Sequence, residues 1–205
     1  MVEQVLRALR LKGVANKDVL GKALGGPSHD VESRLQALVS AGLVKELARG
    51  WSLTPEGRTV LAEQLAAERA TFDHQAIERL YERLCALNVQ FKSLMTEWQI
   101  RSVDGVDTPN LHDDPAYDAA IVERLKEIHG GMLGLLADVA AVAPRLAPYR
   151  SRFENALSGI ESGDRSMMAA PIKDSYHTLW FELHEEFIDL CGRTRAGEAA
   201  AGRGD

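Results

Sequence analysis

The chain has 205 residues, of which 45% are hydrophobic and 26% are charged, and its formal net charge is −6. This composition is that of a globular protein with one or two cores, and it excludes a disordered or collagen-like chain. The sequence contains neither a bilayer-spanning apolar run nor a secretory signal, so we expect a cytoplasmic protein that does not contact membranes. Cys85 and Cys191 lie in unrelated segments, which excludes a disulfide framework. We expect two buried thiols, with a redox pair as the alternative.

The start of the chain predicts two helices. The first carries an apolar stripe made of Val5, Leu6, Leu9 and Leu11. Asn16 is a suitable N-cap for a short second helix over Lys17–Leu24. Gly25-Gly26-Pro27 then predicts a turn, and a turn of this composition between short helices suits a helix-turn-helix corner.

A third helix is predicted after this turn. Ser28 is a good N-cap because its hydroxyl can accept a hydrogen bond from a free backbone N–H of the first turn. Val31, Leu35 and Leu38 fall on one face at helical spacing, and Gly42 occupies the place of a left-handed C-cap.

A short hairpin is predicted next. Two apolar runs, 43–47 and 51–53, flank a tip at 48–50, and residues 54–58 end the hairpin and begin another helix. Helix, tight hairpin and helix is the order of a winged helix-turn-helix. In that fold the helix before the hairpin enters the DNA major groove, and the hairpin tip touches the backbone or minor groove.

Two motifs carry a resemblance to a known family. One is V-x-x-x-L-x-x-L-x-x-x-G-L-V, from Val31 to Val44, and the other is L-T-x-x-G-R, from Leu53 to Arg58. In these two motifs, residues 1–70 resemble the winged-helix domain of MarR-type and related bacterial transcription regulators. The resemblance implies a DNA-binding domain. The chain departs from the family at Asp30 and Glu32, where many such regulators carry Ser, Thr or a basic residue, and in its shorter wing.

The DNA-contacting side chains follow from helical spacing. At about 100° per residue, the side opposite Val31, Leu35 and Leu38 presents His29, Ser33, Gln36 and Ser40. Gln and Ser can bond to base edges, and a helix N-terminus suits a phosphate. Arg34 on the flank and Arg49 at the wing tip are candidates for phosphate, and Arg49 also for a narrow minor groove. The predicted DNA-binding residues are Ser28, His29, Ser33, Arg34, Gln36 and Arg49.

Charge is unevenly distributed along the chain. Residues 1–70 hold ten Lys/Arg and eight Asp/Glu, a net charge of +2, which leaves −8 for the remainder. A positive first half and a negative second half are expected when a DNA-contacting domain is joined to a domain that does not contact DNA. Ordinary solvated surfaces could also produce this difference in net charge.

The second half predicts an antiparallel helical bundle over residues 71–195. From Arg58 to Asp104 there is no Gly or Pro, and the segment reads as helix with a fresh start near residues 71–73. A polar loop is predicted over residues 102–113, and further helices follow at Pro115, at Pro144 and over residues 166–193. No strand is predicted after Leu53, and residues 196–205 are expected to be a disordered tail.

Two of the bundle helices carry apolar stripes wider than one seam, which predicts a dimer interface or a cavity. Polar and aromatic residues border the seams and are candidates for lining an effector site, in which Trp and Tyr would form the walls. These residues are Asn88, Lys92, Trp98, His129, Tyr176, His177, Trp180 and His184. The alternative is that they are satisfied residues at a helix–helix or dimer contact. A metal site at His129, His177 and His184 is disfavoured because histidines seven apart on one helix lie about 10 Å apart.

The sequence therefore predicts a mainly α protein: an N-terminal winged helix-turn-helix with a small β-hairpin wing, followed by an antiparallel bundle. No nucleophile elbow, phosphate-binding loop, dinucleotide glycine set or His-Glu-x-x-His motif is present, so we expect neither an enzyme nor a cofactor. The expected function is that of a dimeric transcription regulator that binds double-stranded DNA, with the bundle as the candidate effector domain. The alternative is a winged-helix adaptor that binds a protein partner.

Overall fold

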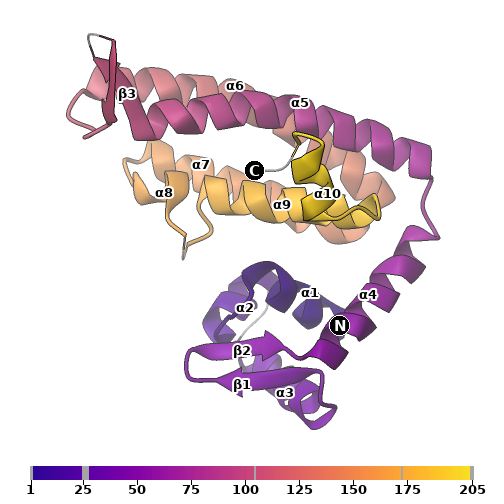
Figure 1. Cartoon of the computed structure of the whole chain (residues 1–205). Helices are drawn as coiled ribbons and strands as arrows, with labels where there is room; N and C mark the ends of the chain where they lie inside the picture. The colour runs from indigo at the N-terminus through magenta and orange to yellow at the C-terminus, as the bar shows by residue number, and fades with distance from the viewer. Residues whose placement is uncertain (1, 25–27, 104, 172, 204–205) are drawn as a thin grey trace. The chain divides into compact units, whose positions relative to one another are not determined.

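The computed structural model describes residues 2–24, 28–103, 105–171 and 173–203. The described chain is mainly helical, with two small antiparallel β-hairpins (Figure 1). It separates into two compact units, Met1–Phe72 and Asp73–Asp205.

The first unit consists of four helices and one hairpin. In chain order these are α1 (Val2–Lys12), α2 (Lys17–Leu24), α3 (Ser28–Ser40), β1 (Val44–Leu47), β2 (Gly50–Leu53) and α4 (Pro55–Arg69). In the hairpin Val44 pairs with Leu53 and Leu47 with Gly50. Ala15 adds an isolated antiparallel bridge to Trp51, which holds the chain between α1 and α2 against the hairpin.

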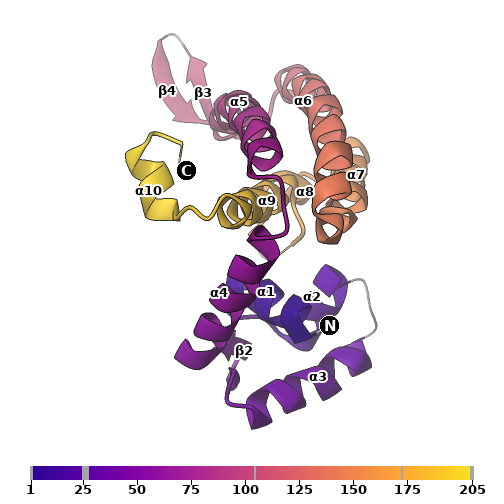
Figure 2. The same ribbon diagram turned by 90° about the vertical axis from the view of Figure 1, so that its right-hand side faces the viewer.

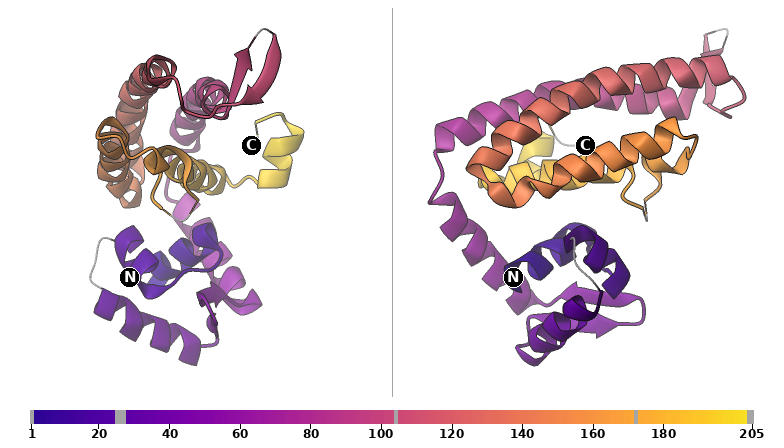
Figure 3. Two further views of the ribbon diagram at one scale, coloured as in Figure 1. Left: turned by 90° about the vertical axis from the view of Figure 1, so that its left-hand side faces the viewer. Right: turned by 180° about the vertical axis from the view of Figure 1, so that it is seen from behind.

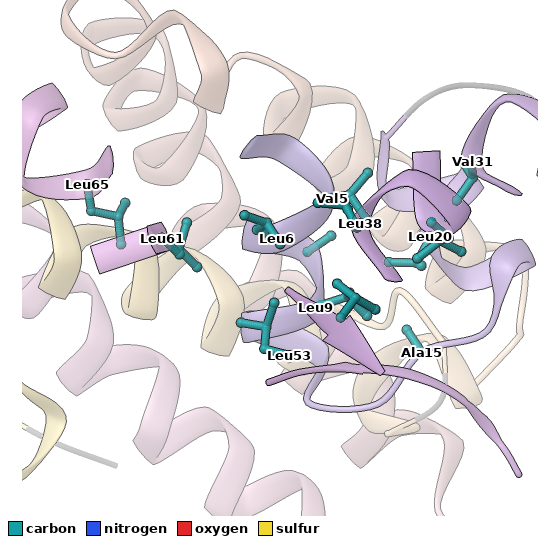
Figure 4. Packing of buried hydrophobic residues seen from close by; sticks show 13 residues of the cluster. Val5, Leu6, Leu9, Ala15, Leu20, Val31, Leu38, Leu53, Leu61 and Leu65 are labelled. Carbon is teal, nitrogen blue, oxygen red and sulfur yellow. The ribbon is translucent and has the colours of Figure 1, made fainter. Parts of the chain in front are cut away.

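One apolar core holds this unit together. Side chains from α1, α2, α3, β2 and α4 point toward one another in the close view of Figure 4. The predicted inward face of α3 is confirmed, because Val31, Leu35 and Leu38 are each at most 2% exposed.

Two predicted turn residues are explained by the backbone at the hairpin base. Gly42 has a φ of +73°, and its N–H donates to the carbonyl of Val39, so it ends α3 as expected. Thr54 caps α4: its hydroxyl accepts the N–H of Gly57 at 3.0 Å and donates to the carbonyl of Gly42 at 2.7 Å. The L-T-x-x-G-R motif therefore joins the end of α3, the hairpin and the start of α4.

The second unit is built on four longer helices. They are α5 (His74–Gln99), α6 (Pro115–Val142), α7 (Pro148–Glu161) and α9 (Tyr176–Leu190). Helix α5 packs against α6, α6 against α7, α7 against α9 and α9 against α5, so the four enclose one core. Figure 2 views these helices nearly end-on, and Figure 3 shows them from the opposite end and from behind. The shorter pieces are η1 (Pro144–Leu146), α8 (Ser166–Ala169) and α10 (Arg195–Ala200).

The expectation that no strand follows Leu53 is wrong. Strands β3 (Ile100–Val103) and β4 (Val106–Pro109) form a second hairpin at the end of α5, with Ile100 opposite Pro109. The hairpin takes part of the segment expected to continue the helix and part of the expected loop. Gly105 has a φ of +79°, which glycine adopts without steric cost.

Two expectations at the end of the chain also change. The helix expected over residues 166–193 is broken into α8 and α9, and Ser175 caps α9 by accepting the N–H of Thr178. Of the tail expected to be disordered, residues 196–200 belong to α10 and residues 204–205 lie outside the described residues. Helix α10 packs on the bundle, because Glu198 is only 3% exposed and its carboxylate accepts hydrogen bonds from Tyr81, Arg193 and Arg203.

Candidate nucleic-acid interface

The outer face of α3 is exposed and is not used by the core. Glu32, Ser33, Gln36 and Ser40 are exposed, on the side away from the buried Val31, Leu35 and Leu38. Ser33 donates a hydrogen bond from its hydroxyl to the carbonyl of Asp30 within the helix. The side chains of Ser28 and His29 lie outside the described residues. Of the predicted contact residues on α3, the structure thus places Ser33 and Gln36 on the solvent face and Arg34 at its half-buried margin.

The β1–β2 hairpin ends in the two-residue turn Ala48–Arg49, and both residues are exposed (Figure 1). Lys45, on β1, is also exposed. The turn therefore carries Arg49 outward, as the sequence predicts, and the nearest strand adds a second cation.

The base of the hairpin is held tightly. Trp51 exchanges two backbone hydrogen bonds with Ala15, at 2.9 Å and 3.1 Å. Gly57 allows α4 to approach the hairpin, because a Cβ at this position would lie 2.0 Å from the carbonyl oxygen of Leu43. Rigid anchoring of this kind fixes the direction in which the exposed tip points.

The acidic residues of α3 do not stand alone. The Glu32 carboxylate lies 3.3 Å from the ammonium of Lys17 at the start of α2. This pair links the start of α2 to α3. A neighbouring ammonium offsets part of the repulsion that a carboxylate on this face would exert on phosphates.

The candidate effector residues mostly bond to core side chains, including one another. Trp180 donates its indole N–H to the amide oxygen of Asn88 at 2.8 Å, and its ring stacks on Phe91 with centroids 4.0 Å apart. His129 lies 3.1 Å from the hydroxyl of Tyr176. Burial lowers the pKa of His129 and raises that of Tyr176, which favours the neutral form of both.

His184 is fully buried, and its Nε2 lies 3.3 Å from the hydroxyl of Tyr81. Lys92 and His177 are instead exposed, and Trp98 packs in a different cluster with its ring 4.3 Å from that of His112. The eight residues therefore do not gather into one site. Within the described part of the chain, no three His, Cys, Asp or Glu side chains are grouped to hold a metal ion.

Sequence reasoning missed a polar cluster at the end of the bundle that carries β3 and β4. Asp118 is 7% exposed and accepts a hydrogen bond from the amide of Asn110, while His112 Nδ1 lies 3.0 Å from its carboxylate. Arg165 approaches the same carboxylate at 3.4 Å. His112 has a φ of +57°, a left-handed conformation that His, Asn and Asp enter more readily than most residues. Asn110 and His112 fall in the expected loop over residues 102–113, which shows no periodic signal, and Asp118 and Arg165 come from elsewhere in the sequence.

The two thiols, which the sequence predicts to be buried, are both half-buried. Burial raises the pKa of Cys85, and it raises that of Cys191 to about 12. A thiol in this state holds little of the reactive thiolate at neutral pH, which favours the interpretation of both as inert side chains.

No described helix combines the length and apolar character needed to cross a membrane. Comparisons with protein-family models, curated proteins and solved structures find no match to this chain.

Proposed function

We propose that this protein is a DNA-binding transcription regulator. Residues 1–72 act as a winged helix-turn-helix, α3 is the recognition helix, and the β1–β2 hairpin is the wing. The observation that carries the proposal is the exposed row of α3 beside a firmly anchored hairpin whose tip bears Arg49. Ser and Gln on such a helix can bond to base edges, while an Arg at the tip suits a phosphate or a narrow minor groove.

The charge distribution supports the same role. The first unit carries the net charge of +2 derived above, within a chain whose total is −6. Cations at Lys17, Lys45 and Arg49 are exposed on this unit, where they can neutralise phosphates.

Recognition by a single helix is weak, and winged-helix regulators that read two-fold sites do so as dimers with half-sites about 34 Å apart. We therefore propose a homodimer held mainly by residues after Thr71. The effector role is not part of the proposal, because Asn88, Trp180, His129 and Tyr176 already pair within the core.

The test is a binding assay with three variants on duplex DNA. Gln36→Ala and Ser33→Ala should reduce the preference for a selected sequence over random DNA, because base contacts carry sequence information. Arg49→Ala should weaken binding to both about equally, because a phosphate contact does not depend on sequence. A wild-type protein that binds no duplex even at low salt would rule the proposal out.

A second candidate is an adaptor that binds a protein partner. It is favoured by three exposed apolar side chains of the first unit, Val14, Val39 and Leu47, which are 46%, 40% and 41% exposed. Exposed apolar side chains on the surface of a small domain can form part of a protein–protein interface. The two candidates differ in salt response, since only DNA binding should weaken steeply as salt rises.

A further inference from the structure

Glu32 is an exposed acidic residue on the face of α3 proposed to meet DNA. Its side chain is 48% exposed, and its carboxylate pairs with Lys17, whose side chain is 46% exposed. An ion pair this open to solvent contributes little to folding. The carboxylate is therefore free to exchange its partner when another donor is offered.

Glu32 also lies next to Gln36 on the helix surface. The two are four residues apart, so they are neighbours one turn from each other. An α-helix with its side chains is about 10–12 Å across and the major groove is about 12 Å wide. A helix seated there therefore brings both its outer face and its flanks close to base edges.

The base edges differ in what they offer a carboxylate, which only accepts hydrogen bonds. Cytosine presents its N4 amino group, whereas guanine presents the acceptors N7 and O6, and thymine presents O4. Adenine has an amino group, but its N7 acceptor stands beside it and repels the second carboxylate oxygen. A carboxylate in the groove is thus stabilised opposite cytosine and repelled elsewhere.

Resting on the proposed function, we infer that Glu32 selects a cytosine in the recognised DNA sequence. The cytosine lies within about two base pairs of the position read by Gln36, because four residues advance the helix by about 6 Å and base pairs are spaced by about 3.4 Å. Lys17 holds the carboxylate in the free protein. On binding, its ammonium turns to a neighbouring phosphate as Glu32 takes the cytosine amino group.

The experiment is selection from a randomised duplex library by the full-length wild type, Glu32→Gln and the matched control Glu63→Gln. Glu63 is an exposed residue of α4, so its substitution removes the same charge away from α3. We expect the wild type and Glu63→Gln to select the same cytosine, with a loss of about ten-fold in affinity when that base is changed. Glu32→Gln should lose this discrimination while its affinity for random DNA rises, since a repulsive charge has been removed.

The outcomes separate the inference from the function on which it rests. If Glu32→Gln selects the same sequence as the wild type with the same discrimination, the inference is overturned and DNA binding stands. If the wild type selects no sequence and binds no duplex at low salt, both are overturned. Lys17→Ala adds an independent readout: it should reduce the slope of log affinity against log salt by about 0.9, the value for one phosphate contact. An unchanged slope overturns the exchange assigned to Lys17.

Discussion

At the scale of single residues, Gly57 shows how one missing side chain fixes the hairpin. Its Cβ position is occupied by the backbone of Leu43, at 2.0 Å from the carbonyl oxygen and 2.9 Å from the carbonyl carbon. Backbone atoms cannot move aside as a flexible side chain can. We expect Gly57→Ala to destabilise the first unit by about 1–3 kcal/mol, the usual cost of overpacking.

Gly130 is the matched control for this substitution. It lies in α6, where an added Cβ would meet no described atom from outside the helix's own backbone within 4 Å, so Gly130→Ala should stabilise the second unit by about 0.5–1 kcal/mol. Hydrogen exchange of the full-length chain at increasing urea concentration, analysed on peptide fragments from residues 1–72 and from residues 73–205, measures the stability of each unit separately. Equal and small effects at both positions would contradict the close approach at Gly57.

Glu198 makes the attachment of α10 depend on pH. Hydrogen bonds from Arg203 and Tyr81 lower the pKa of Glu198 from 4.5 to about 2. A carboxylate with a lowered folded-state pKa contributes stability that is fully present above about pH 4.5 and is lost as the pH falls toward 2. The protection of the α10 amides against hydrogen exchange, measured relative to their intrinsic exchange rates at each pH, should therefore fall over this range. Glu198→Gln should weaken the docking of α10 at neutral pH and remove most of its pH dependence. If the variant keeps the full pH dependence, a group other than Glu198 is responsible for it.

At the scale of elements, α5 and α9 are joined by a buried polar contact. Asn88 is 5% exposed and accepts the indole N–H of Trp180, which is 2% exposed. Either Asn88→Leu or Trp180→Phe leaves the other group buried without a partner, which costs about 1–3 kcal/mol. The double variant removes both polar groups and should be more stable than the sum of the single effects predicts. Urea denaturation of all four proteins gives the coupling energy, and strict additivity would mean that the hydrogen bond contributes nothing.

The helices themselves show which local signals suffice. Asp73 caps α5 by accepting the N–H groups of Gln75 and Ala76, and Asp114 caps α6 in the same way before Pro115. Both starts can be predicted because a cap acts within one turn. The second hairpin was missed, although Asp104 and Gly105 form a dipeptide typical of hairpin turns. Its flanking strands of four residues lack a clear alternation of apolar and polar side chains.

At the scale of the whole molecule, the proposed function depends on how two copies of the chain associate. Part of the wide apolar stripes expected to form a dimer interface is used inside the chain, since Leu136 and Ile188 are 2% and 1% exposed. Phe181 remains 39% exposed, beneath the guanidinium of Arg195 at 4.4 Å. Two-fold DNA recognition still requires two copies of α3.

We therefore predict a particle of twice the 22.5 kDa chain mass in light scattering at micromolar concentration. The selected DNA should contain two inverted half-sites about one helical turn apart. A monomer mass together with a single half-site would show that one copy of the first unit binds DNA alone. This result would overturn the proposed dimer but not the proposed DNA binding.

Features that depend on neighbours along the chain can be predicted from the sequence alone. These are the inward face of α3, its end at Gly42, the placement of Arg49 in the β1–β2 turn, and the helix starts capped by Asp73 and Asp114. All of them follow from spacing and local hydrogen bonding.

Features that depend on contacts between residues far apart in the sequence could not be predicted in this way. The sequence places His184 and Trp180 at the border of an apolar seam, as candidates for an effector site. Their partners Tyr81 and Asn88 come from a helix about a hundred residues earlier (sequence separations of 103 and 92), and both residues lie in the core. Glu198 orders a tail of small and polar residues through Tyr81, from 117 positions away. Burial and charge pairing are set by such distant partners, and one-dimensional patterns of hydropathy do not record them.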